Sequence, residues 1–398
     1  NIISSSFATT TVIFLFIHDK IDSYYLNAYL SSLLCFWIMF LFVAKKVPNK
    51  MKTSASRRDV ISQRVILPRT FFILFLLFSQ INIIFTLINY VRFGIPIFME
   101  SRLVVNMEAG IVNAIVVRLQ GILSTITNLI MFYIIFFGNK RQRVYSKFYF
   151  FLLLIFSFLS GSKSGLLSLF FVFTSFAYLI QLQSNKYMTI LRSKKIYLLL
   201  FIIVISGLTV VIIQSKANLV KAVSSLILRF SSYGDAYVYA YPKGIIEKVS
   251  KQNVFYFLFA DFLSTFRLLP RTIGFGFELK NIVYNISSSV TGPNPRLNLV
   301  GYSYFGFVGN LILCTLSGYL LASIRNMFIF APKRKSIMYH VFSYYFMMLV
   351  ISIETDVLLV VSNLTTNIIL QTIFFLTIFL LMNYSKESVN SNLEKKNI

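Results

Sequence analysis

Residues 197–214 read YLLLFIIVISGLTVVIIQ, a stretch without a charged side chain. An α-helix crosses the hydrocarbon core of a bilayer in about 20 residues, so this stretch predicts a membrane-spanning helix. The whole chain is 57% hydrophobic with a mean hydropathy of +0.74, which a soluble domain of this size does not carry. We therefore predict an all-α, polytopic integral membrane protein with about ten transmembrane helices, at 2–17, 24–44, 70–91, 114–137, 148–161, 164–182, 197–214, 301–324, 338–353 and 359–383.

These spans divide the chain into four parts. Transmembrane helices 1–7 occupy residues 1–214, a large loop occupies 215–300, helices 8–10 occupy 301–384, and 385–398 form a tail. The fifth span, at 148–161, is short for a crossing and is expected to be broken or tilted. Within the loop, residues 219–230 have an amphipathic helical pattern, and the apolar run 254–269 contains two charges and is followed by Pro270. Both are predicted to be helices at the membrane surface.

The net charge of +25 would suggest a nucleic-acid partner in a soluble protein, but its distribution indicates membrane topology instead. The segments 45–69, 138–147, 183–196 and 325–335 and the tail hold 23 Lys and Arg residues against three acids, and the opposite side has 14 basic and 10 acidic residues. Positive loops stay in the cytoplasm. Both termini are therefore predicted to be cytoplasmic, the loop 215–300 lies on the outer side, and no nucleic acid is bound.

The residue types that build metal sites and disulfide frameworks are scarce. The only cysteines, Cys35 and Cys314, fall inside predicted spans, and the chain has two histidines. We expect no disulfide framework, no metal site and no cofactor.

The large loop carries the candidate catalytic residues. Guanidinium groups match phosphate oxygens, so its arginines could clamp a diphosphate. A carboxylate could serve as general base toward a sugar hydroxyl. The alternatives are arginines that contact lipid headgroups and an aspartate that acts as their surface counter-ion. The candidates are Arg229, Arg267 and Arg271 for the clamp and Asp235 for the base; Arg296 lies in the same loop, and Glu354 and Asp356 are further acids on the outer side.

Other residues are candidates for substrate binding. Tyr237 and Tyr239 could stack on sugar rings, although an aromatic belt at the membrane surface explains them equally well. Lys163, within the SGSKSG of residues 160–165, could bind an anion at the start of a helix, or snorkel from a tight turn. The remaining candidates are Arg102 after the third span, Arg118 within the fourth, where a charge needs an explanation, and Glu278 in the loop.

The glycine-rich break at 161–165, the late arginine-bearing outer loop and the GYSYFGFVG of residues 301–309 together resemble Wzy-type O-antigen polymerases. In that family the break often carries arginine where this chain has Lys163. The resemblance implies a glycosyltransferase of the bacterial inner membrane that joins oligosaccharide repeat units at the periplasmic face. It implies undecaprenyl-diphosphate-linked glycans and membrane lipids as partners, together with a chain-length regulator protein.

Two other functions remain open. A flippase of the same lipid-linked glycan would be basic and aromatic too, but it should show paired homologous halves, which this chain lacks. An O-antigen ligase is expected to use an outer-loop histidine, and residues 215–300 contain none.

Overall fold

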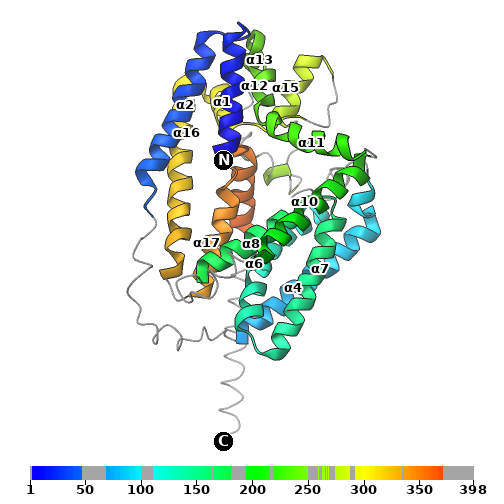
Figure 1. Ribbon diagram of the computed structural model, residues 1–398. Coiled ribbons are helices and arrows are strands. Elements are labelled where there is room, and N and C mark those ends of the chain that lie inside the picture. Colours follow the sequence, from blue (N-terminus) through cyan, green and yellow to red (C-terminus); the bar gives the residue numbers. More distant parts are fainter. Residues whose placement is uncertain are drawn as a thin grey trace, which may run out of the picture.

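The computed structural model describes residues 2–46, 69–99, 111–162, 165–180, 194–215, 218–249, 259, 262–264, 266, 268, 274–286, 292–333 and 336–370. Every regular element among these residues is a helix, which confirms the all-α prediction (Figure 1). The α-helices are α1 (Ile2–Ile17), α2 (Ser23–Val43), α4 (Arg69–Phe93), α6 (Ile111–Phe137), α7 (Lys140–Leu159), α8 (Gly165–Ile180), α10 (Lys194–Ser215), α11 (Leu219–Ser231), α12 (Asp235–Ala240), α13 (Ile245–Lys248), α15 (Phe275–Tyr284), α16 (Leu297–Phe330) and α17 (Ile337–Val350).

Five of these helices, α2, α4, α6, α7 and α16, are long and apolar enough to cross a bilayer. Shorter apolar helices lie at the other predicted spans, namely Ser4–Ile17, Gly165–Ile180, Val204–Ile213, Ile337–Val350 and Val357–Leu370. The chain therefore has the helices of a membrane protein. The number of crossings and the side of the membrane on which each loop lies stay predictions.

The fifth predicted span is longer than the sequence pattern indicated. We predicted a loop at 138–147 followed by a short helix, but α7 begins at Lys140 and has 20 residues. A capping box explains the early start: the Asn139 side chain accepts from the Gln142 backbone N–H at 3.0 Å, and the Gln142 side chain accepts from the Asn139 N–H at 2.9 Å. Basic residues predicted to lie in a loop thus form the first turns of α7.

The eighth predicted span also begins early, at Leu297 rather than residue 301, and α16 continues to Phe330. Its regular geometry is interrupted at Gly306, where φ is +69° and ψ is −170°, a conformation that favours glycine. Residues 297–305 thereby form a separate helical segment beside the large loop. Further along, a Cβ at Gly318 would lie 2.3 Å from the Phe36 carbonyl oxygen, so glycine allows α16 to pack closely along α2.

The buried residues form two clusters. The first joins α1, α2 and α16 to the short loop helices α12, α13 and α15, and the second joins α4, α6, α7 and α8. α17 belongs to both, since Val341 and Tyr344 pack in the second cluster while Val350 packs in the first. Figure 1 shows the first group in the upper part of the view and the second below it to the right.

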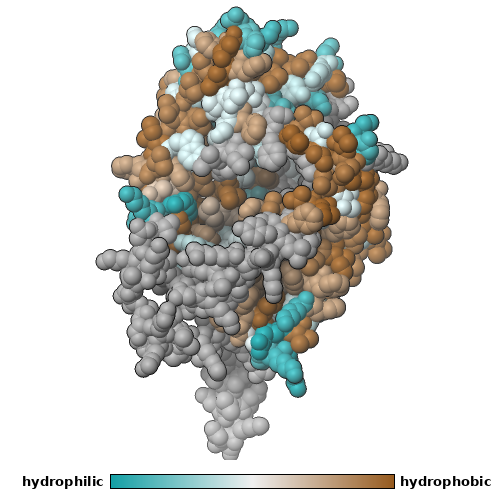
Figure 2. Space-filling view, viewed as in Figure 1, coloured by the Kyte–Doolittle hydropathy of each residue, from teal (hydrophilic) through white to brown (hydrophobic). Residues whose placement is uncertain are grey.

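Segments that we predicted on one side of the membrane lie together. The Asn326 amide donates to the Val43 carbonyl oxygen at 2.8 Å, and the Tyr178 hydroxyl donates to the Ile329 carbonyl oxygen at 2.9 Å. These contacts bring the end of α16 against the ends of α2 and α8. Large apolar side chains are exposed on the helices, with Phe42 86% and Val91 89% exposed, as lipid contact demands. Figure 2 shows such side chains over much of the coloured surface, with hydrophilic ones at its upper end and in smaller groups at the left edge and the lower end.

Candidate functional site

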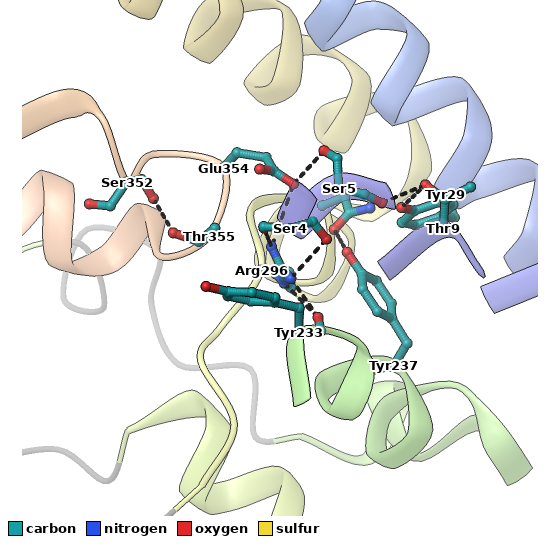
Figure 3. Close-up of polar contacts among 11 residues, drawn as sticks. Ser4, Ser5, Thr9, Tyr29, Tyr233, Tyr237, Arg296, Ser352, Glu354 and Thr355 are labelled. Atoms are coloured by element: carbon teal, nitrogen blue, oxygen red, sulfur yellow. Dashed lines mark hydrogen bonds and ion pairs between the residues drawn. The ribbon is translucent and has the colours of Figure 1, made fainter. Parts of the chain in front are cut away.

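A buried polar cluster lies where three distant parts of the chain meet. Ser4 and Ser5 come from the start of α1, Arg296 from the residue before α16, and Glu354 from the turn that follows α17 (Figure 3). Tyr233, in the 3₁₀ helix η3 (Ser232–Gly234), adds its carbonyl group and its ring. The cluster therefore connects the large loop to the start of α1 and to the turn after α17.

Arg296 is the centre of this cluster, and its side chain is only 3% exposed. Its Nη1 donates to the Ser4 hydroxyl oxygen at 2.7 Å and lies 3.5 Å from Oε1 of Glu354. Its Nε and Nη2 both donate to the Tyr233 carbonyl oxygen, Nε at 3.2 Å, and the guanidinium lies 5.6 Å from the centre of the Tyr233 ring. A buried charge is costly unless it is paired and hydrogen-bonded, and Arg296 is both.

Glu354 is the counter-charge. Its Oε1 accepts from the Ser5 hydroxyl at 2.9 Å, while Oε2 is buried and meets no hydrogen-bond donor among the described residues. Its backbone carbonyl accepts from the Leu297 N–H at 3.2 Å, which joins the turn to the start of α16. Burial raises the pKa of Glu354, and the Arg296 charge and the Ser5 hydrogen bond oppose that rise.

A cavity of about 530 Å³ lies beside this cluster. Its wall combines a carboxylate, two cations, tyrosines, hydroxyls and an amide, and the lining residues are Ser232, Tyr233, Asp235, Ala236, Tyr239, Lys280, Gly292, Pro293, Asn294, Arg296 and Thr355. All but Thr355 come from the predicted large loop. Such a lining suits a ligand that is polar, hydroxylated and at least partly charged.

Close backbone contact shapes one wall of the cavity. A Cβ at Gly276 would lie 1.8 Å from the Pro293 carbonyl oxygen, and one at Gly292 would lie 2.4 Å from the Gly276 carbonyl oxygen. Both positions therefore require glycine. Their close approach holds the segment before Arg296 against α15, which carries Lys280 into the cavity wall.

Asp235, the predicted general base, lines this cavity as the first residue of α12. It is half-buried, and burial raises the pKa of its carboxyl above the ordinary value of 3.8. A carboxylate with a raised pKa is a stronger proton acceptor than an exposed one. The preceding Gly234 packs against α1, since a Cβ there would lie 1.9 Å from the Thr11 hydroxyl oxygen. Asp235 thus sits on backbone held against another helix.

The two tyrosines predicted to stack on sugars differ in position. Tyr239 lines the cavity, and its hydrogen bond with Tyr284 together with burial raises its pKa to about 12. Tyr237 is 2% exposed, donates to Oδ1 of Asn298 at 2.7 Å, and packs edge-on against Tyr29. Tyr237 is therefore a core residue, which speaks against the predicted stacking role. Glu278 is on α15 but is not among the residues that line the cavity.

The structure does not describe the side chains of the remaining predicted site residues. Arg102, Lys163, Arg267 and Arg271 are outside the described residues, as is most of the predicted surface helix at 254–269. The backbone of Arg229 lies in α11, which confirms a helix at 219–230, and that of Arg118 lies in α6, but their side chains are not described. The predicted diphosphate clamp thus stays a prediction. Over the described residues, no group of three or more His, Cys, Asp or Glu side chains is placed to hold a metal ion.

Lys280 and Tyr233 were not predicted to belong to a site, and Arg296 and Glu354 were predicted only to lie on the outer side, without a specific role. One signal was present: Glu354 is an acid in a short turn between two apolar helices, and Arg296 directly precedes another. Charges at such boundaries are either surface anchors or buried partners, and only the fold distinguishes the two. Comparisons with protein-family models, curated proteins and solved structures found no match to this chain.

Proposed function

We propose that this chain is an integral-membrane glycosyltransferase that joins undecaprenyl-diphosphate-linked oligosaccharide repeat units at the periplasmic face of a bacterial inner membrane. The observation that carries the proposal is the 530 Å³ cavity, which places the half-buried Asp235 among cations, tyrosines and hydroxyls next to apolar helices. A lipid-linked glycan has this combination of properties, with a sugar, a charged diphosphate and an apolar tail.

In the proposed reaction Asp235 accepts the proton of an acceptor sugar hydroxyl. The hydroxyl oxygen forms a bond to the anomeric carbon of the donor, and the bond from that carbon to the phosphate oxygen breaks. The diphosphate departs on its lipid with the bonding electrons. The raised pKa of Asp235 suits it to the first step, because a base works best when its pKa is not far below the working pH.

The departing diphosphate gains negative charge, so fixed cations near it accelerate the reaction. Lys280 lines the cavity and is one such cation. The proposed clamp adds the loop arginines Arg229, Arg267 and Arg271. Of these, Arg229 is in α11, three residues before Ser232 of the cavity wall.

The sugars themselves are proposed to contact the uncharged part of the lining. Tyr239 offers a ring, and Asn294 and Thr355 offer hydrogen-bonding groups. A chain-length regulator protein is the partner proposed to set how many units are joined.

The test is the surface glycan of a strain that lacks the gene. A polymerase deletion should leave single repeat units in place of long chains, and re-introduction of the wild-type gene should restore the ladder. Asp235→Asn should fail to restore it, whereas Glu247→Gln, a loop acid outside the cavity lining whose amide can still accept from Tyr25, should succeed. Loss of every repeat unit in the deletion strain would indicate a flippase or a ligase instead.

A further inference from the structure

A second cavity, lined by polar and apolar side chains together, lies among α4, α6 and α7 of the other helical group. It has a volume of about 280 Å³, and its lining residues are Asn82, Ile83, Thr86, Gln120, Gly121, Ser124, Tyr149, Leu153 and Phe156. None of these side chains is charged. All three helices are long and apolar enough to span a membrane, where polar groups are expensive and mark functional positions.

Some of these polar groups hold the helices together. The Gln120 amide donates to the Thr86 hydroxyl oxygen at 2.8 Å, which links α6 to α4. The Asn82 amide nitrogen donates to the Tyr149 hydroxyl oxygen at 3.3 Å, which links α4 to α7. Such bonds are a usual means of association between membrane helices. They do not explain an open volume of this size.

The helix contacts also leave hydrogen-bonding capacity unused. Asn82 is only 5% exposed, yet its Oδ1 has no donor among the described residues. If its amide were turned over, the nitrogen would lack an acceptor instead, so one end of this buried amide is unpaired in either orientation. Tyr149 is 1% exposed, and its hydroxyl accepts from Asn82 but has no acceptor for its own proton among the described residues. A buried polar group without a partner is destabilising, and a bound ligand that pairs with it removes that cost.

The cavity is accessible from outside the helix group. Gly121 is exposed, and a Cβ at this position would meet no atom within 4 Å. Ile83, Leu153 and Phe156 add apolar side chains to its wall. The volume corresponds to roughly nine water molecules at about 30 Å³ each, which is room for a small polar group attached to an apolar chain.

We propose that this cavity binds the neutral hydroxyl group of an amphiphilic molecule from the membrane. A hydroxyl can donate to Asn82 Oδ1 and accept from Tyr149, which satisfies both unpaired groups at once. The absence of charge from the lining disfavours an ionised headgroup, because nothing there would neutralise it. The hydroxyl could belong to a long-chain alcohol or to the sugar of a glycolipid, and the test separates these sources. The proposal is independent of the glycosyltransferase activity.

The test uses the full-length protein in nanodiscs of phosphatidylcholine, a lipid without a hydroxyl or N–H donor. Three photoreactive dodecyl probes are added separately: the free alcohol, its glucoside, and the methyl ether, which cannot donate. The cross-linked peptides are identified by mass spectrometry. We expect the alcohol or the glucoside to label peptides of α4, α6 and α7 about five- to tenfold more than the ether does, the equivalent of one or two hydrogen bonds. The stronger of the two probes identifies the source.

Two variants make the result specific. Gly121→Leu fills the opening while it improves helix propensity, so it should fold and should reduce labelling to the level of the ether. Asn128→Leu removes another amide on α6, whose buried Oδ1 has no partner among the described residues but which does not line this cavity, and labelling should persist. Equal labelling by all three probes would mean that the hydroxyl is not recognised, and labelling that survives Gly121→Leu would mean that the probe binds elsewhere. Either result would overturn the proposal.

Discussion

The variant Glu354→Ala should lower the stability of the protein, because it breaks the buried ion pair between Arg296 and Glu354. This change removes the counter-charge of a guanidinium whose side chain is 3% exposed. Loss of one partner from a buried ion pair costs about 3–5 kcal/mol, because the other charge stays buried. Arg296 keeps its bonds to Ser4 and to the Tyr233 carbonyl, so the lower end of that range, about 3 kcal/mol, is expected.

A graded series separates the charge from the hydrogen bonds. Ser5→Ala removes one hydrogen bond to Glu354 and should cost about 1 kcal/mol. Arg296→Met combined with Glu354→Leu replaces the pair with apolar groups and should cost less than Glu354→Ala alone, because no unpaired charge remains. Glu247→Gln, at an exposed acid of α13, is the control and should leave stability within about 0.5 kcal/mol of wild type.

The assay uses Cys314, which is 1% exposed and lines a small void together with Glu354. With Cys35 replaced by alanine, a thiol-reactive dye reports the opening of this core during a titration with denaturing detergent. The midpoints give the free energy of unfolding of each variant. A loss below about 1 kcal/mol for Glu354→Ala would refute the buried pair, because such a value is typical of an exposed one.

Three further outcomes are expected. Burial raises the pKa of Asp235 above 3.8, so the wild-type rate should fall on acidification at a higher pH than it would with an exposed aspartate as the base. In the same rate–pH profile Asp235→Asn should be inactive at every pH. A wild-type rate that stays constant as the pH falls through this region would exclude Asp235 as the base. Alanine at one or more of the clamp arginines Arg229, Arg267 and Arg271 should slow the reaction about a hundredfold and remove the long chains from the glycan ladder, and lysine at the same position should not restore them. Normal ladders from all three alanine variants would mean that the diphosphate is bound elsewhere. A cysteine at Ser288 should react with an impermeant thiol reagent in spheroplasts and one at Ser56 should not, and the reverse pattern would invert the predicted topology.

The apolar helices were predictable from the sequence because each depends on local composition. Over the described residues each predicted span overlaps an apolar helix, and the differences there are at boundaries, while the number of membrane crossings stays a prediction. At α7 the capping pair Asn139 and Gln142 was visible in the sequence, but the charge of the residues between them outweighed it in the prediction. At α16 a helical segment over 297–305 precedes the non-helical backbone at Gly306, and the apolar sequence pattern did not separate this segment from the longer helix that follows.

The candidate site was predictable only in part, because it depends on contacts between distant residues. Arg296 and Glu354 are 58 positions apart, and Arg296 and Ser4 are 292 apart, so no periodic pattern relates them. Tyr237 and Tyr239 look alike in the sequence, but positions two apart on a helix face different ways. Tyr237 therefore packs with Tyr241, four positions on, in the core, while Tyr239 lines the cavity.

The most direct test of the central claim is a reaction with purified components. The protein is reconstituted in liposomes with lipid-diphosphate-linked repeat units, and the products are separated by gel electrophoresis over time. Wild-type protein should convert single units into a ladder of longer chains and release the lipid diphosphate in equal proportion, and Asp235→Asn should leave the single units unchanged. Wild-type protein that moves the repeat units across the bilayer without joining them would contradict the account.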